Sequence, residues 1–212
     1  MMKNKKIAIM IAAVTVTVGI IGGTLAWFTS SDSIENIFTT GEVKEKIEEV
    51  FTPPTEWLPG DVVNKDVWVN NTGKSDAFIR VWFEVKVENL DGNLDVMPAS
   101  EIKENMELKF TDFVTGSNPK WMADGKESIV ENTYTTSKYY YSEIVSPKEG
   151  TEKILDSVTL KSSAGNEWAN KKIVVTAYSD AIQTANKAYE SWEINNQEIN
   201  DLYEGLSLIN KQ

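Results

Sequence analysis

The residues best spaced for metal chemistry lie around Asp91. Asp91, Asn93 and Asp95 stand at alternate positions, which is the spacing of the first three ligands in a calcium-binding loop of the EF-hand type. That loop also needs glycine at its sixth position and an acidic residue at its twelfth, where this chain has Val96 and Ile102. The pattern therefore favours a solvated turn, with a looser calcium site near Asp91 as the alternative.

The run Gly73-Lys74-Ser75 resembles the end of a phosphate-binding P-loop. A P-loop has another glycine five residues before its last one, so that backbone amides can wrap the phosphates, and it opens a helix. Trp68 stands at that position, and the residues on either side have the pattern of two strands. We expect a hairpin turn here, not a nucleotide site.

Three consecutive tyrosines, Tyr139, Tyr140 and Tyr141, belong to a residue type that stacks on sugars and bases. In a strand only alternate side chains share a face, so this run should divide between the core and the surface. We expect core packing to be its main role, and the same interpretation applies to Trp192.

Histidine and cysteine are both absent from the sequence. Without cysteine there is no disulfide framework and no thiolate nucleophile. Without histidine the usual zinc ligand, the histidine-dependent catalytic triads and the commonest general base near neutral pH are all missing. Most hydrolase mechanisms are thereby excluded, and we predict a protein that is not an enzyme and has no cofactor and no metal site.

The charge of the chain separates a basic start from an acidic remainder. Residues 1–26 carry three lysines and no acidic residue, which leaves 18 basic against 32 acidic residues in the rest. A surface this acidic repels phosphate backbones and anionic lipid, so nucleic acid is an unsuitable partner.

Residues 1–26 have the pattern of a signal peptide. Lys3, Lys5 and Lys6 precede an apolar stretch over residues 7–21, and Thr24-Leu25-Ala26 is a small-x-small cleavage pattern. We predict cleavage between Ala26 and Trp27, contact with the membrane only before that cleavage, and secretion of the product. An uncleaved anchor is the alternative, since the uncharged stretch is long enough to span a bilayer.

The mature chain has the pattern of many short strands separated by turns. The clearest strand covers residues 77–88, where six apolar residues fall on one face: Ala77, Ile79, Val81, Phe83, Val85 and Val87. Further strands are predicted at residues 63–69, 106–114, 137–145, 154–160 and 172–178, with loops at 116–125 and 162–166. We therefore predict a mainly β chain, an antiparallel β-sandwich or jelly roll, over residues 53–212.

Two segments suit a helix by their spacing. Apolar residues recur at helical intervals near the C-terminus, which predicts a short amphipathic helix over residues 197–210. Residues 43–51 also suit a helix, but the preceding glycine and the following prolines leave little room for one, so we favour a strand. Residues 27–52 are assigned to an N-terminal extension.

Several short motifs occur in an order that resembles a known family. They are the leader end Gly23-Thr24-Leu25-Ala26, the pair Trp27-Phe28, Asn36-Ile37-Phe38 with Gly41, Leu58-Pro59-Gly60-Asp61, Val67-Trp68-Val69-Asn70-Asn71-Thr72-Gly73, Phe78-Ile79-Arg80-Val81, the three tyrosines, and Ile173-Val174-Val175-Thr176-Ala177-Tyr178 with Ile182-Gln183. In this order they resemble the TasA/camelysin family, and most closely its BsaA-type branch.

The resemblance implies an exported fibre protein of a Gram-positive biofilm matrix, processed by a signal peptidase of the endoplasmic-reticulum type. It also carries a metallopeptidase interpretation, from which this sequence departs, because it has no His-Glu-x-x-His and no histidine at all. A metallopeptidase is therefore a minor alternative. A monomeric surface adhesin for carbohydrate or host protein is the other.

The segment freed by cleavage predicts how such fibres assemble. It is too short to bury its apolar residues by itself, and they are Trp27, Phe28, Ile34, Ile37, Phe38 and Val43. A neighbouring copy could receive it as an added strand, and a head-to-tail contact of this kind propagates as a homopolymeric filament. The alternatives are a disordered tail and a segment folded back on its own sheet.

A cysteine-free fibre has no disulfides, and β-sandwich pilins often use Lys–Asn isopeptide bonds instead. Such a bond needs a buried lysine, an asparagine and a neutral carboxylic acid in apolar surroundings. Lys44 and Lys46 lie in the first predicted strand and are the candidates, without an identified asparagine partner.

Overall fold

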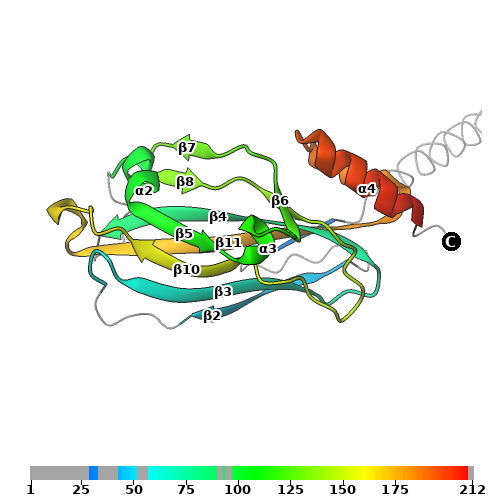
Figure 1. Cartoon of the computed structure of the whole chain (residues 1–212), viewed down its shortest axis with the longest axis horizontal. Coiled ribbons are helices and arrows are strands. Elements are labelled where there is room, and N and C mark those ends of the chain that lie inside the picture. Colours follow the sequence, from blue (N-terminus) through cyan, green and yellow to red (C-terminus); the bar gives the residue numbers. More distant parts are fainter. Residues whose placement is uncertain (1–28, 33–42, 52–56, 90–92, 94–96, 210–212) are drawn as a thin grey trace, which may run out of the picture.

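The computed structural model describes residues 29–32, 43–51, 57–89, 93 and 97–209, and in these the chain forms two antiparallel sheets packed face to face (Figure 1). The first sheet has the order β1-β11-β4-β8-β7, with β9 also paired to β4 and β6 paired to β9. Its strands are β1 (Thr29–Asp32), β4 (Ala77–Asn89), β6 (Trp121–Ala123), β7 (Ser128–Val130), β8 (Thr133–Thr135), β9 (Tyr139–Tyr141) and β11 (Lys171–Gln183). The predicted antiparallel sandwich is confirmed.

The second sheet has the order β2-β3-β10-β5. Its strands are β2 (Glu45–Phe51), β3 (Val62–Asn71), β5 (Met106–Phe110) and β10 (Leu155–Leu160). β2 pairs with β3 along its whole length, so the predicted strand at residues 43–51 is confirmed, and it belongs to the sandwich instead of to an N-terminal extension. The sandwich therefore starts before residue 53, where the sequence analysis places its beginning.

The longest ladder joins β4 to β11, from the pair Lys171–Asn89 to the pair Gln183–Ala77. One face of β4 alternates as predicted, and all six of its apolar residues are buried between the sheets. β-Branched and aromatic residues suit this half-buried pleated surface, which explains why so regular an alternation forms a strand.

The outer face of β4 is buried at one end, which its alternating pattern does not predict. Phe78 packs in a second apolar cluster, stacked on Tyr203 with 4.2 Å between ring centroids. Tyr140 joins this cluster while its neighbours Tyr139 and Tyr141 join the core between the sheets, so all three tyrosines are buried. The expectation that the run reaches the surface is wrong, because the C-terminal helix covers it.

Helices are few and short in the described chain. They are α2 (Ala99–Asn105), α3 (Asp112–Thr115) and α4 (Gln197–Ile209), with 3-10 helices η1 (Asn166–Trp168) and η2 (Ala185–Trp192). The predicted C-terminal helix is confirmed as α4. The strand predicted at residues 106–114 ends at Phe110 and gives way to α3, and β6 begins inside the loop predicted at 116–125. No helix among the described residues is long and apolar enough to cross a membrane.

Candidate functional site

One edge of β11 is an open hydrogen-bonding surface of the sandwich. β11 pairs with β4 along its full length, but on its other side it pairs only with the four residues of β1, opposite residues 179–182. No strand in the described chain pairs with residues 171–178 on that side. Their backbone N–H and C=O groups can therefore accept an added strand.

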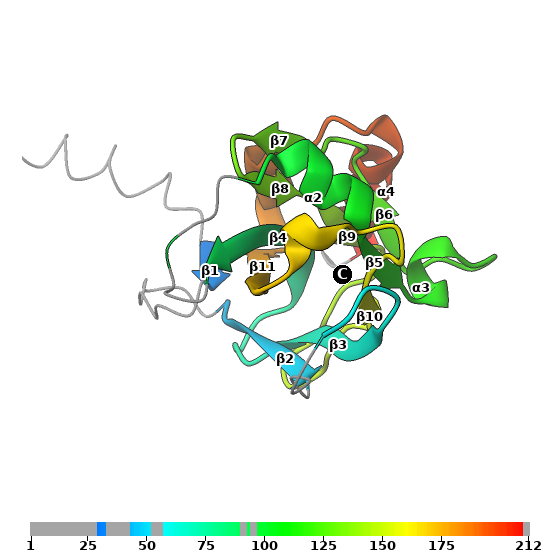
Figure 2. The same ribbon diagram turned by 90° about the vertical axis from the view of Figure 1, so that its left-hand side faces the viewer.

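The second sheet is open on the same side of the molecule. β2 is its edge strand, and it lies against both β1 and β11 (Figure 2). Where the two edges diverge they leave a groove of about 520 Å³ between residues 172–177 of β11 and the inward side of β2 and β3. The groove therefore runs along the part of β11 that β1 leaves uncovered.

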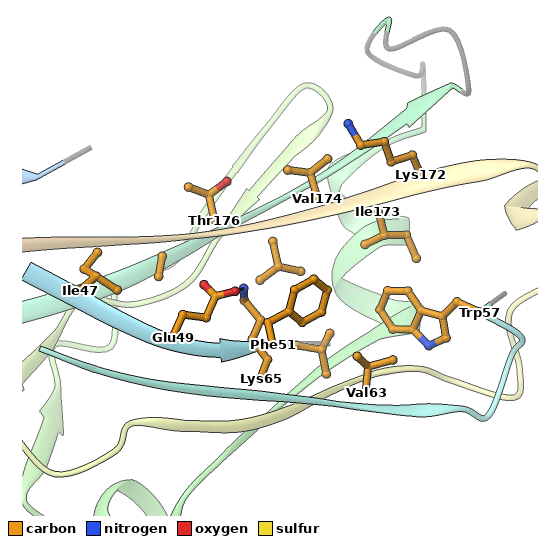
Figure 3. A pocket seen from close by; sticks show the side chains of 13 residues that line it. Ile47, Glu49, Phe51, Trp57, Val63, Lys65, Lys172, Ile173, Val174 and Thr176 are labelled. Carbon is orange, nitrogen blue, oxygen red and sulfur yellow. Dashed lines mark hydrogen bonds and ion pairs between the residues drawn. The ribbon is translucent and has the colours of Figure 1, made fainter. Parts of the chain in front are cut away.

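The walls of the groove are mostly apolar (Figure 3). Ile47 lies at the end next to Thr176, and Trp57 lies at the end next to Ile173. The ring of Phe51 projects between these ends, and Phe51 as a whole is 45% exposed. An apolar trough beside an open strand edge is the geometry that receives an extended segment, with side chains entering at alternate positions.

One ion pair interrupts this apolar lining. Lys65 occupies an inward position on β3, its side chain is 6% exposed, and its Nζ lies 2.5 Å from Oε1 of Glu49 on β2. The ammonium also lies 4.9 Å from the centroid of the Phe51 ring. A buried charge of this kind is costly to keep unless a partner and further hydrogen bonds satisfy it.

The predicted donor residues Trp27, Phe28, Ile34, Ile37 and Phe38 lie outside the described residues, as does the cleavage site between Ala26 and Trp27. Val43 is described, and it packs in the core of its own chain. A segment available to a neighbour therefore ends before Val43.

The two lysines proposed for isopeptide bonds are both exposed in the isolated chain. Lys44 precedes β2, and the side chain of Lys46 is 61% exposed and paired with Glu48. Neither has the burial that the bond requires. The buried lysine of this region is Lys65, which was not among the predicted candidates.

A bend at Gly73-Lys74-Ser75 joins β3 to β4. The expected hairpin is wrong, because these two strands belong to different sheets and the chain crosses here from one sheet to the other. The buried Asn71 holds the bend, because its Nδ2 donates hydrogen bonds to the carbonyl oxygens of Ser75 and Val145, both at 2.8 Å. Its Oδ1 accepts a hydrogen bond from the backbone N–H of Gly73 at 2.9 Å. The geometry is that of a side-chain-closed turn, not of a phosphate cradle.

Asp91 and Asp95, on which the calcium alternative depends, lie outside the described residues. Within the described part of the chain, no three His, Cys, Asp or Glu residues cluster closely enough to hold a metal ion.

A second cleft, of about 390 Å³, lies on the outer face of the first sheet beside Trp82. The ammonium of Lys138 lies 5.3 Å from the centroid of the Trp82 ring. Burial, and then the nearby positive charge of Arg80, lower the pKa of Lys138. Asp124 and Glu127 also line this cleft, so its character is polar and of mixed charge.

One sequence signal could have found the ion pair in the groove. Val63, Lys65, Val67 and Val69 occupy alternate positions, so a lysine stands in a row of core-facing valines. A charged residue at such a position indicates a buried partner or a function. The partner Glu49 could not be found in this way, since it lies on another strand.

A protein-family model described as camelysin metallo-endopeptidase matches residues 2–146 of the chain. The matched part extends beyond β9 and ends before β10 and β11. No curated protein and no solved structure matches the chain with significance.

Proposed function

This chain belongs to the camelysin metallo-endopeptidase family, and from that membership and its groove we propose that it is a structural subunit of extracellular fibres in a bacterial biofilm matrix. From the order of its motifs we also propose that it belongs to the BsaA-type branch of that family. In this proposal its main partner is a second copy of itself, and its role is assembly instead of catalysis.

The observation that carries the proposal is the open edge of β11 beside an apolar groove. An extended segment of a neighbouring copy adds to this edge by main-chain hydrogen bonds and places alternate side chains in the groove. The donating segment and the receiving groove are different surfaces of the same chain. The contact is therefore head-to-tail, and it propagates as a filament instead of closing into a dimer.

In the isolated chain, Thr29–Asp32 pairs with its own β11 as β1. In the monomer these four residues thus fold back on their own sheet, which is one of the two alternatives to strand donation. Assembly then requires the neighbour's segment to take the place of β1 and to continue along the uncovered part of β11. The exchange replaces four paired residues with a longer ladder, which favours the filament.

Processing precedes assembly in this proposal. An uncleaved leader holds the donating segment at the membrane, and a signal peptidase of the endoplasmic-reticulum type releases it between Ala26 and Trp27. The product is secreted and remains at the cell surface or in the matrix.

The peptidase named in the family description requires a metal, and the residues present do not fit one. The whole sequence contains no histidine, and no acidic cluster suited to a metal occurs in the described ranges. Zinc held by aspartate and glutamate alone, without a histidine or cysteine ligand, departs from the ligand sets of catalytic zinc sites. We therefore assign no catalytic step to this chain.

A monomeric adhesin is the second candidate function. The polar cleft beside Trp82 favours it, because the Trp82 ring, the ammonium of Lys138 and the acidic residues Asp124 and Glu127 lie there together. An adhesin of this kind predicts a monomer that binds ligand without forming filaments.

Covalent bonds between copies form the last part of the proposal. Lys44 and Lys46 are exposed, so a neighbouring copy would have to cover them before an isopeptide bond could form. Lys65 is already buried in the groove beside the carboxylate of Glu49. Of these three lysines it alone has the burial that the bond requires; the bond would join its Nζ to the side-chain carbonyl carbon of an asparagine and release ammonia.

Deletion of residues 27–38 from the mature chain tests the proposal. The truncated chain should remain folded and monomeric in size-exclusion chromatography, and negative-stain microscopy should show no filaments. It keeps its groove, so mixing it with the full mature chain should shorten the filaments by capping one end. Normal filaments from the truncated chain alone would refute strand donation.

A further inference from the structure

We propose that the Lys65–Glu49 pair selects the incoming strand by binding the side-chain amide of Asn36 of a neighbouring copy, and so fixes the register of strand addition. This inference rests on the proposed function, because it names which residue of the donated segment the groove recognises. Three observations lead to it: the register of β1, the chemistry of the groove, and the number of residues between β1 and β2.

The register comes from β1 itself. β1 runs antiparallel to β11, with Thr29 opposite Ile182 and Asp32 opposite Ser179. Continued without a shift, the same register places residue 34 opposite Ala177, residue 36 opposite Val175 and residue 38 opposite Ile173. These three residues of β11 line the groove, and residues directly opposite each other share a face of the sheet. A donated strand in this register therefore points Ile34, Asn36 and Phe38 into the groove.

The chemistry of the groove matches that order. Its lining is apolar at both ends and carries the Lys65–Glu49 pair between them (Figure 3). Between Trp27 and Val43, only one polar residue has large apolar residues two positions before and two positions after it, and this residue is Asn36. The sequence of the segment and the lining of the groove therefore select the same register as β1.

An asparagine amide also satisfies both members of the pair. Its NH₂ group can donate a hydrogen bond to the carboxylate of Glu49, and its oxygen can accept one from the ammonium of Lys65. It carries no charge, so it leaves the pair balanced. An apolar side chain at this position would exclude water from the ion pair. It would offer no hydrogen bonds in return, and charges covered in this way are costly.

The chain length between β1 and β2 prevents the chain's own segment from covering the whole uncovered edge of β11, so complete coverage requires a second copy. A strand that followed the edge from Asp32 to the position opposite Lys171 would advance about 26 Å over eight residues. β2 begins at the other end of the groove, where Ile47 lies beside Thr176 and β2 meets β1. Residues 41–44 would then have to return over this distance, and they span at most about 17 Å. A segment from another copy meets no such limit.

A synthetic peptide of residues 29–40 tests the inference with the intact mature chain. The wild-type peptide should bind the chain and slow filament growth by occupying the edge of β11. Changing Asn36 to leucine in the peptide should weaken this inhibition about 10- to 100-fold, because the added strand would cover both charges and the leucine would make no hydrogen bond to either. The same comparison is then made with filaments of the double variant Lys65→Met/Glu49→Leu, whose groove has no ion pair. There the N36L peptide should inhibit growth at least as well as the wild-type peptide.

Two neighbouring isoleucines provide a matched control for register. Ile34→Ala in the peptide should weaken inhibition more than Ile37→Ala, because only Ile34 shares a face with Asn36. Equal inhibition by the wild-type and N36L peptides, or a larger effect at Ile37, would overturn the register while leaving strand addition intact. A wild-type peptide that neither binds nor slows growth would instead refute strand addition, and the inference with it.

Discussion

Arg80 of β4 and Asp180 of β11 lie directly opposite each other and form a largely enclosed ion pair. Nε and Nη2 of Arg80 donate hydrogen bonds to the same oxygen of Asp180, at 2.9 and 2.6 Å. The guanidinium also lies 4.6 Å from the centroid of the Trp192 ring. One side chain thus joins the longest ladder of the sandwich to η2, which leads into the C-terminal helix.

Replacing Arg80 with methionine should lower the free energy of unfolding by roughly 3–5 kcal/mol, because it leaves the enclosed carboxylate of Asp180 without its partner. The double variant Arg80→Met/Asp180→Asn should lose less. Lys46→Met, which removes an exposed pair with Glu48, is the matched control and should change stability by no more than about 1 kcal/mol. Urea unfolding measures all three, and equal losses for Arg80→Met and Lys46→Met would contradict this account.

N-terminal sequencing of secreted protein should give Trp27 as the first residue. Thr24-Leu25-Ala26 has the small-x-small pattern of a cleavage site, and a polar stretch follows Phe28. An intact Met1, or a start inside the apolar stretch, would contradict export and release.

Purified mature chain should not cleave casein, with or without added zinc. The chain has no histidine to bind the metal or to act as a base near neutral pH. Chelator-sensitive cleavage that persists after repurification would overturn the structural role proposed above.

Boiling mature fibres in detergent should leave a ladder of oligomers on a gel if the covalent part of the proposal holds. Lys65→Arg should abolish the ladder, because arginine keeps the charge but cannot form the amide bond. The double variant Lys44→Arg/Lys46→Arg is the control with the exposed lysines, and its ladder should persist. Complete collapse of wild-type fibres to monomer would exclude covalent linkage.

Alkaline solution should unfold the protein as its tyrosines ionise. Burial raises the pKa of all seven tyrosines above the usual value of 10: Tyr134, Tyr139, Tyr140, Tyr141, Tyr178, Tyr189 and Tyr203. Above pH 10 the unfolded chain therefore loses phenolic protons that the folded chain keeps, so the free energy of unfolding falls as pH rises.

Absorbance of phenolate at 295 nm and circular dichroism measure this dependence together. The rise in absorbance should coincide with the loss of structure, at a pH above 10. Complete ionisation near pH 10 with the circular dichroism unchanged would contradict the buried state of these rings.

The long strands could be predicted from the sequence because their periodicity is regular. The residues from Ala77 to Val87 alternate without a break, and the structure buries the predicted face. Alternation shows which side chains share a face, but not what covers that face. Phe78 and Tyr140 are buried by Tyr203, which lies more than 60 positions away from both in the chain. No local sequence pattern indicates this contact.

Two further features were beyond the sequence for different reasons. β6, β7 and β8 have three residues each, too few to show a period of two. The groove depends on the sheet order, which brings β2 to the same side as β11. It also depends on a register that sets Phe51 opposite Lys65, with Glu49 two residues away on the same face and in contact with the ammonium. The donor segment could be proposed from its composition, whereas the surface that receives it required the structure.

The direction of β4 and β11 also determines how a fibre subunit would bear mechanical load. These two thirteen-residue strands run along the longest axis of the molecule (Figure 1). If copies are joined along the edge of β11, tension in the filament acts parallel to the strands and perpendicular to the hydrogen bonds between them. The bonds of a ladder loaded in this way share the force and must break together, instead of opening one after another from an end. In such a filament the longest ladder of each subunit would lie beside the contact with the next copy, so the subunit would resist pulling by flow or by neighbouring cells.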